Sequence, residues 1–189
     1  IRNAGLDDVT LIVGHQRDLV TKEFPDYPTI VQEEQFGTGH AVRCAEGLRR
    51  SQHTLVMFGD KPLLSPKTIR EFVQAHLTQK SVLTASTVLH PVPETYSEGY
   101  GTVVRQDGRV MALRKIIGTI ECDGGMYAFK TAWLWNHIGN LGVHDNGRGA
   151  KEYFLPDLVE VATKQGEVIG EYRIQNYEEA TGINLPEHI

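Results

Sequence analysis

The feature that most constrains the fold is a short apolar run that leads directly into a glycine and an acid. Residues 54–58 read Thr-Leu-Val-Met-Phe, and Gly59 and Asp60 follow at once. A short apolar run bounded by turn residues is typical of a strand buried in a parallel sheet. Ligands bind outside the carboxyl ends of strands in open α/β sheets. We therefore expect Asp60 to be the central catalytic carboxylate.

The first half of the chain alternates between strand and helix patterns. Apolar strand-like runs cover residues 9–13, 29–32, 54–58 and 82–89. Helical spacing of apolar residues covers 41–48 and 66–77, and Ser65-Pro66 is a cap followed by a first-turn proline. This alternation predicts a Rossmann-like, doubly wound and mostly parallel α/β sheet.

The second half adds an antiparallel pattern. Gln106-Asp107-Gly108 separates two β-prone runs, which is a strong hairpin signal. A strand at 126–129, a helix after Asp157 and a last strand at 168–174 follow. We expect a single domain over residues 1–189, with a mixed, mostly parallel sheet and an antiparallel hairpin insertion.

Composition excludes several classes of function. The net charge of −5 over 189 residues argues against a nucleic-acid surface, and no apolar run has the length of a membrane span. Cys44 and Cys122 are far apart and not in a Cys-x-x-Cys frame. Two free, buried thiols indicate a reducing compartment, so we expect a cytoplasmic protein.

A polar loop over residues 32–40 ends in Gly37-Thr38-Gly39, just before a helix. Free N–H groups at a helix start suit an anion. The alternative is a plain helix start capped by Thr38, and the motif by itself favours that interpretation.

Four segments together resemble the nucleotidyltransferase domain of bacterial N-acetylglucosamine-1-phosphate uridyltransferase, a sugar-nucleotide pyrophosphorylase. They are Gln-x-Glu-Gln-x-Gly-Thr-Gly-His-Ala at 32–41, Gly-Asp-x-Pro-Leu at 59–63, Gly-Tyr-Gly at 99–101, and Glu-Tyr at 152–153 with Asp157 and the closing Gly-Ile-Asn at 182–184. Their order and the elements between them make the combination specific, and it covers nearly the whole chain.

The resemblance implies a reaction between UTP and a sugar 1-phosphate that gives a UDP-sugar and pyrophosphate, as in the synthesis of cell-wall precursors. It implies Mg²⁺ held by Asp60 and Asn184, an oxygen pair that this cation accepts. Residues 1–90 would form the nucleotide-binding half and 91–189 the sugar-binding half. The nucleotide contacts would be Gln32, Gly37, Thr38, Gly59 and Asp60, and the sugar contacts Gly101, Lys115 and Asp123. Homo-oligomerisation stays open.

Within this resemblance, Gln32 is the residue expected to read uracil. An amide can donate and accept at once, which suits the imide edge of that base. A relative that uses CTP or GTP is the alternative within the same superfamily.

Three positions depart from the family pattern. Lys115 stands where the family has a sugar-binding Glu, and Asp123-Gly124-Gly125 replaces Asn-Thr-Gly. Lys61 replaces a small or apolar residue, and we expect it to reach a phosphate or to lie in solvent. These differences leave the acceptor sugar open, and they favour a second hypothesis, a non-catalytic module that binds nucleotide sugars.

The family opens with a strand and a Gly-rich basic loop, and this chain shows neither. Ile1 lies where the helix after that strand should end. We therefore expect a βα unit to precede Ile1 in the complete protein, and without it a sheet with a gap and two unpaired edges. The family's second domain, a left-handed β-helix, also has no counterpart in the sequence.

Overall fold

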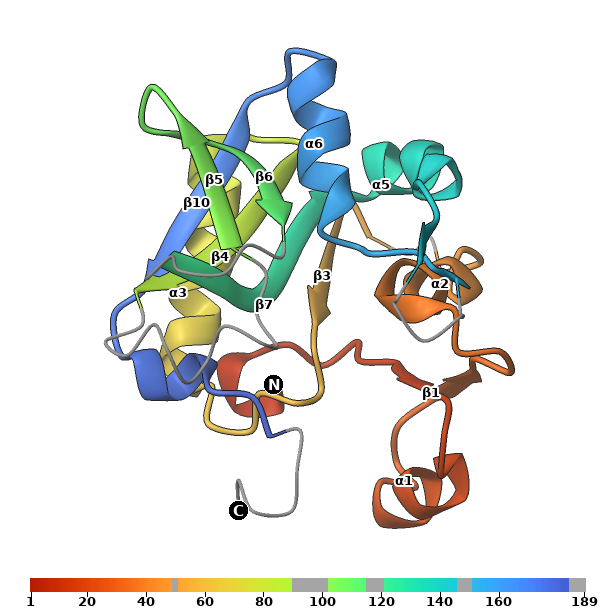
Figure 1. Cartoon of the computed structure of the whole chain (residues 1–189). Coiled ribbons are helices and arrows are strands. Elements are labelled where there is room, and N and C mark those ends of the chain that lie inside the picture. The colour runs from red at the N-terminus through yellow and green to blue at the C-terminus, as the bar shows by residue number, and fades with distance from the viewer. Residues whose placement is uncertain (49–50, 90–101, 115–120, 146–150, 184–189) are drawn as a thin grey trace.

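The computed structural model describes residues 1–48, 51–89, 102–114, 121–145 and 151–183 (Figure 1). Its centre is a six-stranded sheet in the order β10–β4–β7–β5–β6, with β3 also paired to β7. These strands are β3 (His53–Met57), β4 (Leu83–Leu89), β5 (Thr102–Gln106), β6 (Arg109–Arg114), β7 (Glu121–Lys130) and β10 (Ile169–Ile174).

Two small sheets and several helices complete the described part. The small sheets pair β1 (Leu11–Val13) with β2 (Thr29–Val31), and β8 (His144–Asp145) with β9 (Lys151–Glu152). The α-helices are α1 (Arg17–Glu23), α2 (Gly37–Cys44), α3 (Pro66–Gln79), α5 (Thr131–His137) and α6 (Asp157–Lys164). The 3₁₀ helices are η1 (Arg2–Ala4), η2 (Ile138–Asn140) and η3 (Tyr177–Ala180). None of the described helices is long and apolar enough to cross a membrane.

The main sheet is mixed, as the sequence predicts, but the expectation of mostly parallel pairing is wrong, because among the described strands of this sheet the one parallel pair is β4 with β10. Strand β3, expected to be a buried parallel strand, is half-buried and pairs antiparallel. β7 pairs antiparallel with β3, β4 and β5, whereas β4 and β10 are parallel. It follows that β3, β4, β5 and β10 run in one direction, and that β6 and β7 run against them. The strand at the centre is therefore the long β7, which has β4 along one edge and shares its other edge between β3 and β5.

Helices cover both faces of this sheet, which is the doubly wound arrangement. On one face α3 contributes Ile69 and Phe72 to a cluster with Val88, Met126 and Ile174. On the other face, α5 and α6 pack against the sheet around Leu83, Tyr127, Phe129, Leu134 and Leu158. Because both faces of the sheet are covered, β4 and β7 are buried along nearly their whole length, including their polar residues Thr84, Ser86, Thr87 and Asp123.

Two local predictions are confirmed in detail. Helix α3 begins at Pro66, and the Ser65 hydroxyl accepts a hydrogen bond from the Thr68 amide. Strands β5 and β6 form the expected hairpin, with positive φ angles at Asp107 and Gly108.

The expected gap in the sheet is also present. Strand β1 pairs with β2, and β3 pairs with β7, but these two groups belong to separate sheets. Among the described residues, no strand pairs with the other edge of β1 or with the other edge of β3. Figure 1 shows β1 set apart from the main sheet, on the side where β3 lies.

Candidate active site

Asp60 stands where the sequence predicts it, just beyond the carboxyl end of β3. The strand ends at Met57, and the Phe58 amide still donates to the Gly125 carbonyl oxygen at 3.0 Å. Gly59 is exposed, and a Cβ built on it would meet nothing within 4 Å. A ligand can therefore approach the turn that carries Asp60.

The Asp60 carboxylate has an unused acceptor. Its Oδ1 atom is buried and receives no hydrogen bond within the described part of the chain. Buried polar atoms are nearly always paired, so an orphaned carboxylate oxygen calls for a partner that the described residues do not supply. A cation or a ligand donor fits this position.

The closing segment of the chain reaches the same turn. The Ile183 amide donates to the Asp60 backbone carbonyl at 2.8 Å. Asn184, the predicted second magnesium ligand, is the next residue and lies outside the described residues. The pairing of Asn184 with Asp60 stays a prediction. The preceding residue, Ile183, is hydrogen-bonded to the Asp60 backbone.

Lys61 lies neither in solvent nor on an exposed phosphate site, so the solvent expectation is wrong. Its side chain is 7% exposed, and Nζ donates to the Ala180 carbonyl oxygen at 2.7 Å. The side chain lies across Gly125, where a Cβ would be 3.0 Å from Lys61 Cε. Burial lowers the pKa of the Lys61 ammonium, and the nearby carboxylates of Asp60 and Asp123 oppose that shift.

Asp123, a predicted sugar contact, is buried on β7 and is bonded within its own strand. Its Oδ1 accepts from the Gly125 amide at 2.8 Å, and its Oδ2 accepts from the Tyr127 hydroxyl. Burial raises the pKa of Asp123, whereas the hydrogen bonds from Tyr127 and Gly125 and the charge of Lys61 lower it. Oδ1 thus holds the backbone at Gly125, and Oδ2 holds the Tyr127 side chain. We call Asp60, Lys61, Asp123 and residues 180–183 the Asp60 cluster.

The predicted nucleotide contacts form a second group. Gln32 follows β2, is 8% exposed, and donates from Nε2 to the Gly37 carbonyl oxygen at 3.1 Å. The same Nε2 lies 3.0 Å from His40 Nδ1. Gly37 opens α2 with a φ of 86°, and a Cβ there would lie 2.7 Å from the Tyr153 carbonyl oxygen. Only glycine meets both conditions.

Thr38 does not cap its helix, so the plain capping interpretation is wrong. Helix α2 has no side-chain cap, and the Thr38 hydroxyl accepts instead from the Leu155 amide at 3.0 Å. The Gly39 amide donates to the Tyr153 carbonyl at 2.8 Å. The start of α2 is thereby fastened to residues 153–155. We call Gln32, Gly37, Thr38 and His40, with residues 153–155, the Gln32 cluster.

Sequence reasoning missed the roles of three residues. His40 contacts Gln32, Tyr127 contacts Asp123, and Lys61 contacts the backbone of η3. Tyr127 could have been found, because it lies four positions after Asp123 on one strand and so shares its face. Nothing local in the sequence indicates the contact of Lys61.

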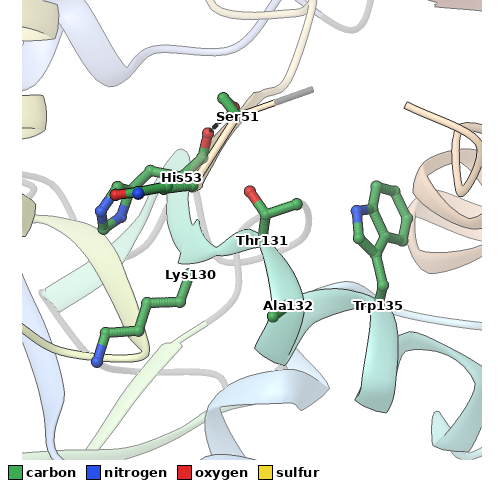
Figure 2. Close-up of a pocket in the computed structure, with 7 residues that line it drawn as sticks. Ser51, His53, Lys130, Thr131, Ala132 and Trp135 are labelled. Carbon is green, nitrogen blue, oxygen red and sulfur yellow. Dashed lines mark hydrogen bonds between the residues drawn. The ribbon is translucent and has the colours of Figure 1, made fainter. Parts of the chain in front are cut away.

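A separate hollow of about 470 Å³ lies at the opposite end of β3 (Figure 2). Residues 51–53 and 130–132 line it together with Trp135, whose indole Nε1 is buried without a partner in the described part. Figure 2 shows the Lys130 side chain extending away from Trp135. The hollow offers no carboxylate, so it does not suit a phosphate-bound cation. Within the described residues, no group of three His, Cys, Asp or Glu side chains is placed to hold a metal ion.

The sequence aligns with well-described enzymes. It is 36% identical over 200 residues to the bifunctional protein GlmU of Clostridium botulinum, an alignment that covers 97% of this chain and 41% of that protein. It is 34% identical to the bifunctional protein GlmU of Fervidobacterium nodosum, over 94% of this chain and 38% of that protein. The predicted resemblance to GlmU-type sugar-nucleotide pyrophosphorylases is confirmed over nearly the whole chain. It spans about two fifths of the length of these curated relatives. No family model matches the sequence.

Solved structures share the fold of this chain. The inositol-1-phosphate CTP transferase of T. maritima superposes with a TM-score of 0.67 at 14% identity, covering 95% of this chain and 71% of that one. A UDP-glucose pyrophosphorylase complexed with UDP-glucose gives a TM-score of 0.69 at 13% identity, covering 95% of this chain and 78% of that one. At such identities the likeness is one of fold, and it confirms the predicted nucleotide-diphospho-sugar transferase fold.

The two clusters have complementary chemistry for a sugar-nucleotide pyrophosphorylase. The Asp60 cluster offers an unpartnered carboxylate oxygen, and the Gln32 cluster offers an amide beside a helix start. Gly101 and Lys115, the other predicted sugar contacts, lie outside the described residues. Their roles stay predictions.

Proposed function

We propose that this chain transfers a uridylyl group from UTP to a sugar 1-phosphate. A phosphate oxygen of the sugar 1-phosphate would attack the α-phosphorus of UTP. The bond between the α-phosphorus and its bridging oxygen to the β-phosphorus would break, and pyrophosphate would leave. No protein nucleophile is required, because the acceptor phosphate is already ionised.

The observation that carries this proposal is the orphaned Oδ1 of Asp60 at the end of β3. Mg²⁺ takes few protein oxygens and fills its other positions with phosphate and water, so Asp60, with Asn184 as the second ligand, fits it. When bound, Mg²⁺ would supply positive charge against the phosphates.

The remaining residues would position the substrates. Gln32 would contact the base, and the open surface at Gly59 would admit the phosphates beside Asp60. Lys61 would hold the turn in place through Ala180 instead of binding phosphate itself, since its ammonium is buried and already bonded.

The test is a pyrophosphate-release assay on the complete protein with UTP and a series of sugar 1-phosphates, beginning with N-acetylglucosamine 1-phosphate. We expect release that requires UTP, one or more sugar 1-phosphates and Mg²⁺. Turnover with CTP or GTP but not UTP would assign the chain to the alternative nucleotide. Calorimetry with UTP and UDP-sugars completes the test, because tight binding without any turnover would establish the non-catalytic module instead.

A further inference from the structure

The Gln32 amide is held in one orientation by two acceptors. Its nitrogen lies 3.1 Å from the Gly37 carbonyl oxygen and 3.0 Å from His40 Nδ1. A backbone carbonyl can only accept, so the amide atom facing it has to be the nitrogen. An amide nitrogen carries two hydrogens, and these two contacts use both.

The same contacts determine which ring nitrogen of His40 carries the proton. Its Nδ1 accepts a hydrogen bond, so the ring proton lies on Nε2. The Phe36 ring packs edge-on against the His40 ring, with centroids 5.3 Å apart. Because α2 and Phe36 fix the imidazole, the imidazole in turn fixes the amide.

Gln32 therefore has fewer hydrogen-bonding groups left for a ligand than its residue type suggests. No described residue donates a hydrogen bond to Gln32 Oε1. This oxygen is also not one of the fully buried polar atoms that lack a partner, so it is accessible to a ligand. The amide presents an acceptor and no donor. In this arrangement both amide hydrogens of Gln32 are used within the protein, so the inferred contact with the base is made by Oε1 as an acceptor.

We propose that His40 is a positioning residue that holds Gln32 with Oε1 toward the nucleobase, so that the site selects a pyrimidine with a hydrogen on N3. The inference rests on the proposed function. Uracil carries an N3–H donor, whereas cytosine in the same pose would turn the lone pair of its N3 toward the Gln32 oxygen. His40 thus decides between the two bases without contacting either.

Two substitutions isolate the role of Nδ1. In His40→Asn the side-chain Oδ1 takes the place of Nδ1 and can accept from Gln32. In His40→Gln the acceptor sits further out, at the place of Nε2, and cannot. Both variants are polar and uncharged, so they differ mainly in where the acceptor lies.

The measurement is the ratio of kcat/KM for UTP to that for CTP, together with turnover of 3-methyl-UTP. We expect His40→Gln to lower the ratio by up to about tenfold, the effect of one hydrogen bond, because the amide is then held by the Gly37 carbonyl alone and turns its nitrogen toward cytosine more readily. His40→Asn should keep the preference for UTP. Wild-type protein should reject 3-methyl-UTP, whose N3 has no hydrogen.

The possible results of these assays distinguish a failure of the proposed His40 role from a failure of the proposed uridylyl transfer. Turnover of UTP by the wild type, with an unchanged ratio in His40→Gln, would overturn the role of His40 and leave the function intact. Equal losses of UTP preference in both variants would also overturn it, because the position of the acceptor would then not matter. Absence of turnover with every nucleotide would instead refute the proposed function.

Discussion

The backbone amide of Ile183 donates a hydrogen bond of 2.8 Å to the backbone carbonyl oxygen of Asp60. A second contact, from Lys61 Nζ to the Ala180 carbonyl at 2.7 Å, joins the same two segments. Together they fasten the turn after β3 to the segment that leads to Asn184. The predicted magnesium ligands thus belong to segments that the described backbone already holds together.

The first prediction concerns the orphaned carboxylate. Asp60→Asn keeps the shape of the side chain but removes the charge, and we expect kcat for pyrophosphate release to fall by at least about 10²-fold, as when a preorganised electrostatic group is lost. The free energy of unfolding should change little, because the buried Oδ1 has no hydrogen bond to lose and only the attraction of the carboxylate to the Lys61 ammonium is removed. Asp26→Asn, at an exposed position, is the matched control. If Asp60→Asn kept most of the kcat for pyrophosphate release, the Asp60 carboxylate would not be required for the reaction.

The second prediction concerns Lys61. Lys61→Met keeps most of the side-chain volume but leaves the Ala180 carbonyl without its donor. We expect a loss of about 1–3 kcal/mol in the free energy of unfolding, measured by urea denaturation at pH 7. Lys67→Met should have little effect, because that exposed side chain has only a 3.8 Å ion pair with Glu71. A Lys61→Met protein more stable than the wild type would mean that desolvation of the ammonium costs more than its hydrogen bond gains.

The third prediction concerns the start of α2. Gly37→Ala would force an L side chain into a φ of 86° and place its Cβ 2.7 Å from the Tyr153 carbonyl oxygen. We expect a loss of stability of about 1–2 kcal/mol from the backbone conformation alone, with weaker UTP binding as the Gly37 carbonyl moves away from Gln32. Thermal denaturation and calorimetry measure the two effects. Gly47→Ala is the control, since a Cβ there meets nothing. An unchanged UTP affinity would separate Gly37 from the base site.

The fourth prediction is a pH dependence of stability that arises at His76. This side chain is 2% exposed and lies against His53 and Thr84, at 2.9 Å and 2.8 Å. Burial, with smaller contributions from His53 and Lys130, lowers its pKa to about 4 from an ordinary 6.5. Between these pH values the unfolded chain binds a proton that the folded chain does not, so stability falls as the pH drops through the window. The difference amounts to about 3 kcal/mol.

Urea denaturation of wild type and His76→Gln at pH 7, 5.5 and 4 measures this effect. The variant should lose less stability on acidification, because it lacks the titrating ring. His15→Gln, at an exposed position, should follow the wild type. Parallel curves for wild type and His76→Gln would show that His76 contributes nothing to acid sensitivity.

Local signals made much of the fold predictable. The Ser65-Pro66 start of α3 and the Asp107-Gly108 hairpin depend on residues a few positions apart, so the sequence pattern contains their cause. The unpaired edge of β3 among the described strands agrees with the gap that the sequence predicts.

The internal contacts of the site were less predictable. The partner of Lys61 is 119 positions away, and no periodicity or spacing relates two such residues. The His40 contact spans only eight positions, but it depends on the left-handed conformation at Gly37 that starts the helix there. The place of Asp60 after its strand predicted it as a site residue, and the family resemblance predicted Gln32, whereas the orientation of both side chains required the folded backbone.

The long separation between Lys61 and Ala180 has a consequence during protein synthesis. A ribosome adding roughly 5–20 residues per second needs on the order of ten seconds to travel the 119 positions between them. Throughout that interval the nascent chain carries Asp60 and Lys61 without the segment that fastens their turn. The turn that carries Asp60 therefore cannot take its final contacts until after most of the core strands have emerged.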